Sequence, residues 1–168
     1  MNGSEILVDA IGRVKGVVHA AVKGLSTEQL ATKPYENGNT VAWLVWHLSR
    51  VQDDHVADAA GFDQLWTSAG WAERFDLPFE PEATGYAQGP QDVAAVRAEA
   101  SLLLEYHDAV SARTIDWVRG LGADELDRIV DESWDPPVTL GVRLVSVISD
   151  DLQHAGQASF VRGLLLAR

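Results

Sequence analysis

Apolar residues recur at three- and four-residue steps along four long segments of the sequence, and this pattern constrains the fold more than any other feature. The segments cover about residues 4–25, 41–60, 91–120 and 140–166. Such steps match the 3.6-residue turn of an α-helix, so each segment presents one apolar face. No segment sustains the alternation typical of a β-strand. The chain is therefore expected to be all-α, with four helices packed as a bundle.

The connections between these helices differ in length. Residues Ser26–Leu30 predict one extra helical turn before Pro34–Asn39 breaks the pattern. The stretch from Gly61 to Pro90 carries several glycines, prolines and aromatic residues without a sustained period, so we expect an ordered loop that packs on the bundle. A shorter polar connection precedes the last helix. We expect one domain, residues 1–168, with the topology of an up-down or crossover four-helix bundle.

Composition excludes several classes of function. The formal net charge is -12, which repels phosphate backbones and anionic lipids, so neither nucleic acid nor a membrane is expected as a partner. The chain has no cysteine, so any thiol chemistry must use a thiol supplied from outside. Residues Met1–Glu5 lack the basic region of a signal peptide, and no apolar run is long enough to span a bilayer. A cytoplasmic location is expected.

Three side chains could share a metal ion. Asp150 and His154 lie four residues apart in the last predicted helix and therefore project from the same side, one turn apart. His47 lies in an otherwise apolar run, Val41–Leu48, where an unpaired imidazole would be costly to bury. Two imidazoles and one carboxylate leave a coordination position open, which is typical of a catalytic zinc site.

The spacing alone leaves other interpretations open. Asp150 and His154 can form an ion pair on the helix surface, and His47 can be a core histidine that bonds to a backbone carbonyl. His55 follows His47 by eight residues, on a similar side of the helix, and Asp54 lies beside it. A solvated helix end would explain this pair as well as a role in ligand binding would.

Three motifs together resemble the DinB-like superfamily, specifically its DUF664-type branch. The motifs are Asn37–Leu48, Thr84-Gly85-Tyr86, and Asp150–Gln157 followed by Arg162–Leu165, so the resemblance covers nearly the whole chain. It implies a four-helix bundle with metal ligands formed by one histidine of the second helix and two residues four apart on the last. Those positions are His47, Asp150 and His154 here. Many relatives have histidine at all three, and a carboxylate at the position of Asp150 is associated with mycothiol-dependent enzymes.

The resemblance also implies a function. The relatives with a carboxylate include the N-terminal domain of mycothiol-dependent maleylpyruvate isomerase and stand-alone mycothiol S-transferases, and this chain looks more like the latter. We therefore expect a metal-dependent S-transferase in which a divalent ion, zinc as the first choice, activates mycothiol as a thiolate for attack on small electrophiles in detoxification. The catalytic metal ligands would be His47, Asp150 and His154, and the thiol would be bound by Asp54, His55 and Arg143.

Two other functions fit the same residues. A non-catalytic stress or sensor module would use the ion mainly to tie the second helix to the fourth. A metal-dependent hydrolase would activate a water at the open position and would need no thiol. Thiol-dependent turnover separates the transferase from both. A homodimer is compatible with the sequence, which does not identify the electrophile and selects mycothiol over another small thiol only through the resemblance.

Overall fold

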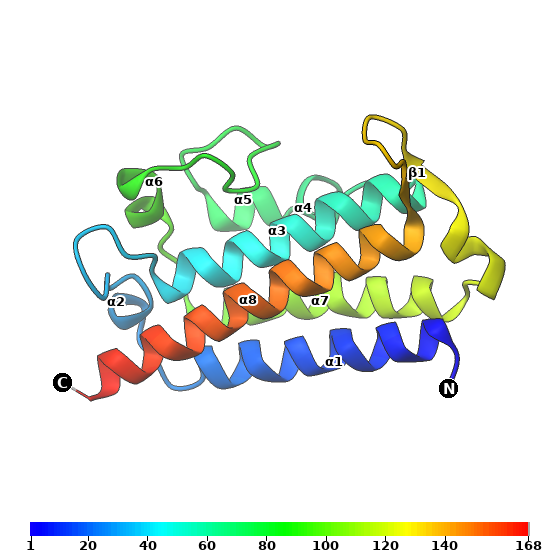
Figure 1. The fold of residues 1–168 in the computed structure, drawn as a ribbon. Helices are drawn as coiled ribbons and strands as arrows, with labels where there is room; N and C mark the ends of the chain where they lie inside the picture. The colour runs from blue at the N-terminus through cyan, green and yellow to red at the C-terminus, as the bar shows by residue number, and fades with distance from the viewer. Residues whose placement is uncertain (168) are drawn as a thin grey trace.

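The computed structural model of the chain describes residues 1–167. Four long helices, α1 (Gly3–Val22), α3 (Val41–Ala60), α7 (Ala100–Arg119) and α8 (Leu140–Leu166), pack as a bundle (Figure 1). The other elements are short: α2 (Thr27–Leu30), α4 (Leu65–Ser68), α5 (Trp71–Phe75), α6 (Pro90–Ala95), a 3-10 helix η1 (Ala123–Asp127), and the strands β1 (Ile129–Asp131) and β2 (Val138–Thr139). The all-α, DinB-like fold predicted from the sequence is confirmed.

The four long helices run in an up-down-down-up order. α8 packs between α1 and α3, and α7 packs between the same two helices on the opposite side. In Figure 1, α1 and α8 run in one direction and α3 and α7 run in the other. The long connection between α3 and α7 is therefore a crossover, which returns the chain to the end of the bundle at which α3 began.

The crossover covers α3. The first ten residues of α3, Val41–Arg50, are all buried, including the polar side chains of His47, Ser49 and Arg50. Trp66, Trp71 and Phe75 of the crossover belong to the same core cluster as α3, and Trp66 packs edge-on against Trp46. The stretch predicted to be an ordered loop is thus packed on the bundle, and it also contains the short helices α4 and α5.

Two elements differ from the sequence prediction. The single helix predicted over residues 91–120 is wrong at residues 96–99, which separate α6 from α7. Val96 and Ala98 are both buried there, because alternate side chains of an extended segment point to the same face. The connection before α8 forms an antiparallel ribbon in which Ile129 pairs with Thr139. This ribbon is too short to produce a visible alternation in the sequence.

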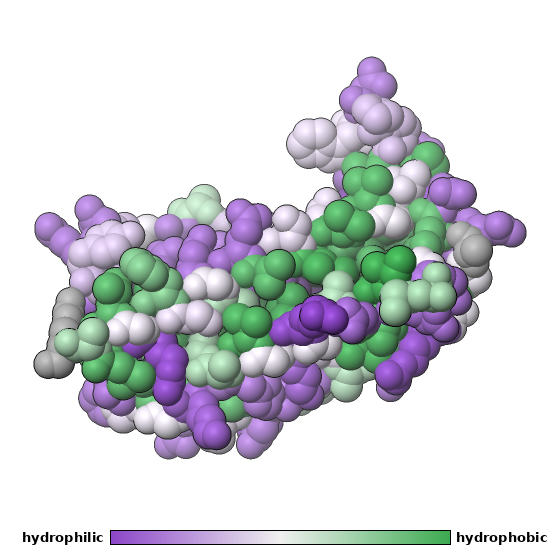
Figure 2. All heavy atoms as spheres, turned by 60° about the horizontal axis from the view of Figure 1, so that its bottom comes forward, coloured by the Kyte–Doolittle hydropathy of each residue, from purple (hydrophilic) through white to green (hydrophobic). Residues whose placement is uncertain are grey.

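The core divides into two clusters along the bundle. The larger cluster joins α3 to the C-terminal halves of α1 and α8 and to the crossover, and the smaller one lies near the start of α1 and of α8. Apolar side chains also gather on one outer side of the bundle, formed by α8 and α1 (Figure 2). Within residues 1–167, no helix combines the length and apolar composition needed to cross a membrane.

Candidate metal centre

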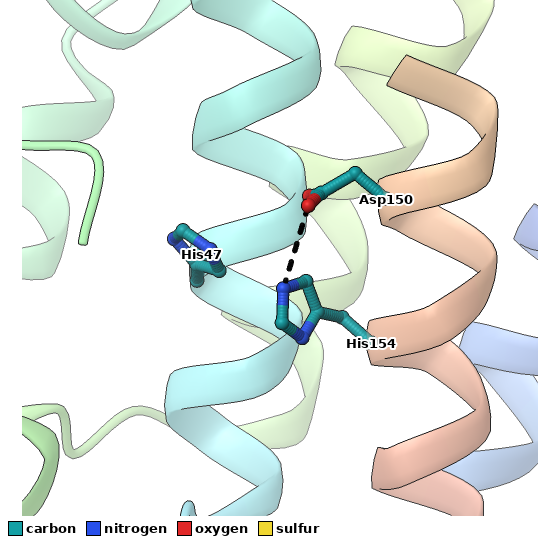
Figure 3. Close-up of side chains that lie close together, drawn as sticks. All are labelled: His47, Asp150 and His154. Carbon is teal, nitrogen blue, oxygen red and sulfur yellow. Dashed lines mark ion pairs between the residues drawn. The ribbon is translucent and has the colours of Figure 1, made fainter. Parts of the chain in front are cut away.

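His47, Asp150 and His154 converge between α3 and α8. His47 projects from α3, while Asp150 and His154 project one turn apart from the facing side of α8 (Figure 3). One ligand atom of each residue lies within 4.8 Å of the others, and His154 Nε2 is 3.6 Å from Asp150 Oδ1. Ligand atoms around a tetrahedral zinc ion lie about 3.4 Å apart, so small side-chain rotations would bring all three onto one ion.

A backbone carbonyl fixes the orientation of the His47 ring. His47 Nδ1 is hydrogen-bonded to the carbonyl oxygen of Thr84. A carbonyl can only accept, so Nδ1 donates its proton and Nε2 presents a lone pair toward α8. Burial lowers the pKa of His47, which keeps the imidazole neutral at pH 7, as a metal ligand must be. The bond expected of an ordinary core histidine is therefore present, and it leaves the second nitrogen available.

The segment that supplies this carbonyl is itself held against α3 on both sides of His47. One turn before it, Trp43 Nε1 donates a hydrogen bond of 2.8 Å to Gln88 Oε1. One turn after it, Arg50 Nε donates a hydrogen bond of 3.1 Å to the carbonyl of Ala83. Residues 83–88 thus run alongside α3, and we call them the crossover clamp.

Only a glycine fits at the centre of the crossover clamp. Gly85 has a φ of +105°, a conformation that other residues rarely adopt, and a Cβ atom there would overlap His47 Nδ1. The His47 ring is also enclosed by aromatic side chains. Trp43 stacks on it with the ring centroids 4.6 Å apart, and Tyr86 packs edge-on at 5.4 Å. These contacts leave the ring little freedom to rotate away from α8.

The side chains of the two candidate ligands on α8 are also oriented to bind a cation. His154 Nδ1 lies 3.1 Å from the Gln157 Oε1 acceptor, so Nδ1 carries the proton and Nε2 faces Asp150. Asp150 Oδ2 is buried and has no hydrogen-bond partner among the described residues. A buried carboxylate oxygen without a donor is costly unless a cation binds it. The donor set of two imidazole lone pairs and one carboxylate therefore fits a divalent ion.

A cavity of about 390 Å³ opens beside Asp150. It extends along α8 from Asp150 to Arg143, a separation of seven residues or about 10 Å. Valines form much of its wall, and polar and aromatic side chains complete it; the lining is Val51, His55, Tyr86, Asp131, Trp134, Val138, Val142, Arg143, Ser146, Val147 and Asp150. The cavity thus reaches from Asp150, the one candidate ligand among its lining residues, to a polar end two turns away.

The polar end of the cavity sets one positive side chain, Arg143, between two carboxylates. Arg143 Nη2 donates a hydrogen bond of 3.0 Å to Asp131, and Nη1 lies 3.6 Å from the carboxylate of Asp58. Arg143 Nη1 also lies 3.3 Å from His55 Nδ1. Because Arg143 can only donate, His55 Nδ1 accepts and His55 Nε2 carries the proton. Burial, and then the charge of Arg143, lower the pKa of His55, so this ring is a neutral donor.

The residues predicted from the sequence therefore fall in three places. The three predicted metal ligands converge, and His55 and Arg143 line the cavity. Asp54 does not line this cavity; its carboxylate accepts a hydrogen bond of 2.7 Å from Gln64 and borders a separate surface hollow. Two other residues of the cavity had no role predicted from the sequence: Tyr86, which lies in the motif Thr84-Gly85-Tyr86, and Asp131, which no sequence pattern marks.

Comparison with known proteins agrees with this geometry. The sequence model of the family described as mycothiol-S-transferase matches residues 6–166, so the chain belongs to that family. It is also similar to the crystal structure of a conserved protein from Enterococcus faecalis, with a TM-score of 0.93 and 30% identity over 100% of this chain and 99% of that chain. No curated protein matches the chain. The resemblance to mycothiol-dependent S-transferases stated from the motifs is confirmed.

Proposed function

We propose that this member of the mycothiol-S-transferase family is a metal-dependent enzyme that joins mycothiol, through its sulfur, to a small electrophile. His47, Asp150 and His154 hold one divalent cation, with zinc as the first choice. The observation that carries the proposal is the convergence of two imidazoles and a carboxylate within 4.8 Å, with one buried carboxylate oxygen that has no partner among the described residues.

Because the chain has no cysteine, a thiol nucleophile would have to come from a substrate. A divalent cation at this site supplies positive charge that lowers the pKa of such a thiol, so that sulfur is nucleophilic at neutral pH. Three protein ligands would leave a position open, and a thiol would approach it through the cavity beside Asp150.

The polar end of the cavity binds the body of the thiol. His55 Nε2 offers a hydrogen-bond donor there, and the Asp131 carboxylate offers an acceptor. Because the two carboxylates of Asp131 and Asp58 outnumber the single positive charge of Arg143, this end favours a neutral polar ligand over an anionic one. His55 and Arg143 therefore bind the thiol, as predicted from the sequence. Asp54 contributes only through its position beside His55.

We infer that Tyr86 assists the electrophile. It lines the cavity with Asp150 and packs edge-on against His47. Burial, and then the charge of Asp150, raise the pKa of its hydroxyl, so the group stays protonated at neutral pH. A protonated hydroxyl can donate a hydrogen bond to the electrophile while the sulfur attacks it.

The test begins with the metal content of the purified protein, measured by mass spectrometry for the wild type, for His154→Ala and for His19→Ala. His19 is a matched control, because it lies on α1 and pairs with Asp108 at 2.7 Å, away from the metal centre. We expect near-stoichiometric zinc in the wild type and in His19→Ala, and its loss in His154→Ala. Absence of metal from the wild type would contradict the site itself.

Turnover then separates the three functions that fit the residues. The wild type should conjugate monochlorobimane only when mycothiol is added, and His154→Ala should lose that activity. Zinc without turnover would favour a metal-binding module. Hydrolysis of substrates without any thiol would favour a metal-dependent hydrolase, in which water occupies the open position.

A further inference from the structure

The outer face of α8 carries no charge. Every exposed residue of α8 within the described chain is uncharged, although the net charge of the protein is -12. The exposed faces of α1 and α7, by contrast, carry charged side chains such as Asp9, Arg13, Glu105 and Asp116. Large exposed apolar side chains concentrate on α8; they are Val142, Val145, Leu152, Phe160, Leu164 and Leu166. Figure 2 shows the apolar band on this side of the bundle.

Seven residues of this face follow the spacing of a helix-pairing seam. We call them the α8 stripe: Val142, Val145, Ser149, Leu152, Gly156, Phe160 and Gly163. Their steps are three or four residues and average 3.5, the period at which one helix lies along another. The candidate ligands Asp150 and His154 project from a different side of α8, because neither falls at a position of this three- and four-residue series.

The two glycines of the α8 stripe leave open space beside the helix, as Gly12 and Gly16 do on α1. A Cβ atom built at Gly156 or Gly163 meets nothing within 4 Å. What distinguishes the glycines of the α8 stripe is that they lie on an uncharged face among exposed apolar side chains. Small residues at such positions allow a second helix to approach closely.

We propose that the α8 stripe is the surface through which two copies of this chain associate. Two copies with a charge of -12 repel each other, and an uncharged face lets them meet without bringing like charges together. A basic partner would instead be attracted to the acidic faces. An antiparallel pairing centred near Leu152 sets the Ser149 of one copy near the Gly156 of the other, since these lie three and four residues from the centre. The stripe is thus complementary to itself, as a two-fold interface requires.

The test measures mass in solution by analytical ultracentrifugation at micromolar concentrations. The wild type should sediment at twice the chain mass of 18.2 kDa. Leu152→Glu places two carboxylates at the centre of the interface and should weaken association at least about 100-fold, giving a monomer. The matched control is Ile129→Glu, because Ile129 is a similarly exposed apolar residue on β1, outside the stripe, and this variant should stay dimeric.

A second variant tests whether loss of the dimer could result from misfolding. Gly156→Leu has open space in a single copy, so it should fold, yet it should be monomeric and should lack the concentration-dependent unfolding temperature of a dimer. A monomeric wild type, or a Leu152→Glu variant that stays dimeric, would overturn the proposal. Both variants should keep their zinc, since no metal ligand belongs to the stripe, so the outcome is independent of the metal proposal.

Discussion

Replacing Gly85 with alanine should weaken metal binding while leaving the bundle folded. The new Cβ would overlap His47 Nδ1, and the φ of +105° disfavours alanine in any case. The His47 ring cannot easily retreat, because it is 3% exposed and Trp43 stacks on it. The ring or the clamp must therefore shift, and the bond to the Thr84 carbonyl is lost or distorted. Loss of such an outer partner typically costs 10- to 100-fold in metal affinity, or about 1.4–2.7 kcal/mol.

The matched control for this substitution is Gly61→Ala. Gly61 also has a positive φ, +74°, but a Cβ there meets nothing within 4 Å, so it carries the backbone cost without the overlap. Zinc affinity would be measured for both variants by competition with a chromophoric chelator, and urea unfolding would report the stability of each. A zinc affinity for Gly85→Ala within twofold of that for Gly61→Ala would refute the role given to the clamp.

Two further predictions concern residues outside the ligand set. Burial lowers the pKa of His107 from 6.5 to about 4, so the unfolded chain binds a proton that the folded chain does not. The free energy of unfolding should therefore be highest above pH 6.5 and fall by up to about 3 kcal/mol as the pH drops to 4. The urea midpoint should fall less steeply with decreasing pH for His107→Gln than for the wild type. Equal slopes for the two proteins would contradict this prediction. Arg143→Gln should raise the KM for mycothiol about tenfold at unchanged zinc content. The reason is that the Arg143 side chain bonds to Asp131 and His55 and to none of the metal ligands. An unchanged KM would rule out a role for Arg143 in the cavity.

The long helices could be predicted closely because their starts are marked by side chains. Thr40 and Thr139 each accept a hydrogen bond from a backbone N–H in the first turn of α3 and α8, and both helices begin where the sequence indicated. The break before α7 could not be predicted in the same way. Val96 and Ala98 suit the buried face of a helix as well as that of an extended segment, so tertiary packing alone decides between them.

The candidate site was only partly predictable, for a similar reason. Helical spacing brings Asp150 and His154 to one side of α8, and that placement follows from the sequence alone. Spacing does not show that Asp151 is buried, where desolvation, and then the charge of Asp150, raise the pKa of its carboxyl well above the ordinary value. Spacing also does not reveal that the Thr84 carbonyl bonds to His47, because every residue type has a backbone carbonyl.

The crossover, more than the bundle, determines whether His47 can serve as a ligand. Packing of α3 on α8 brings the imidazole close to Asp150 and His154, but packing alone does not select which nitrogen carries the proton. That choice is made by the crossover clamp, whose Thr84 carbonyl lies 37 residues further along the chain. Substitutions in the bundle core should therefore act mainly on stability, because they leave cavities in packed regions. Substitutions in the clamp should instead act on metal affinity at nearly constant stability, because they change the presentation of one lone pair.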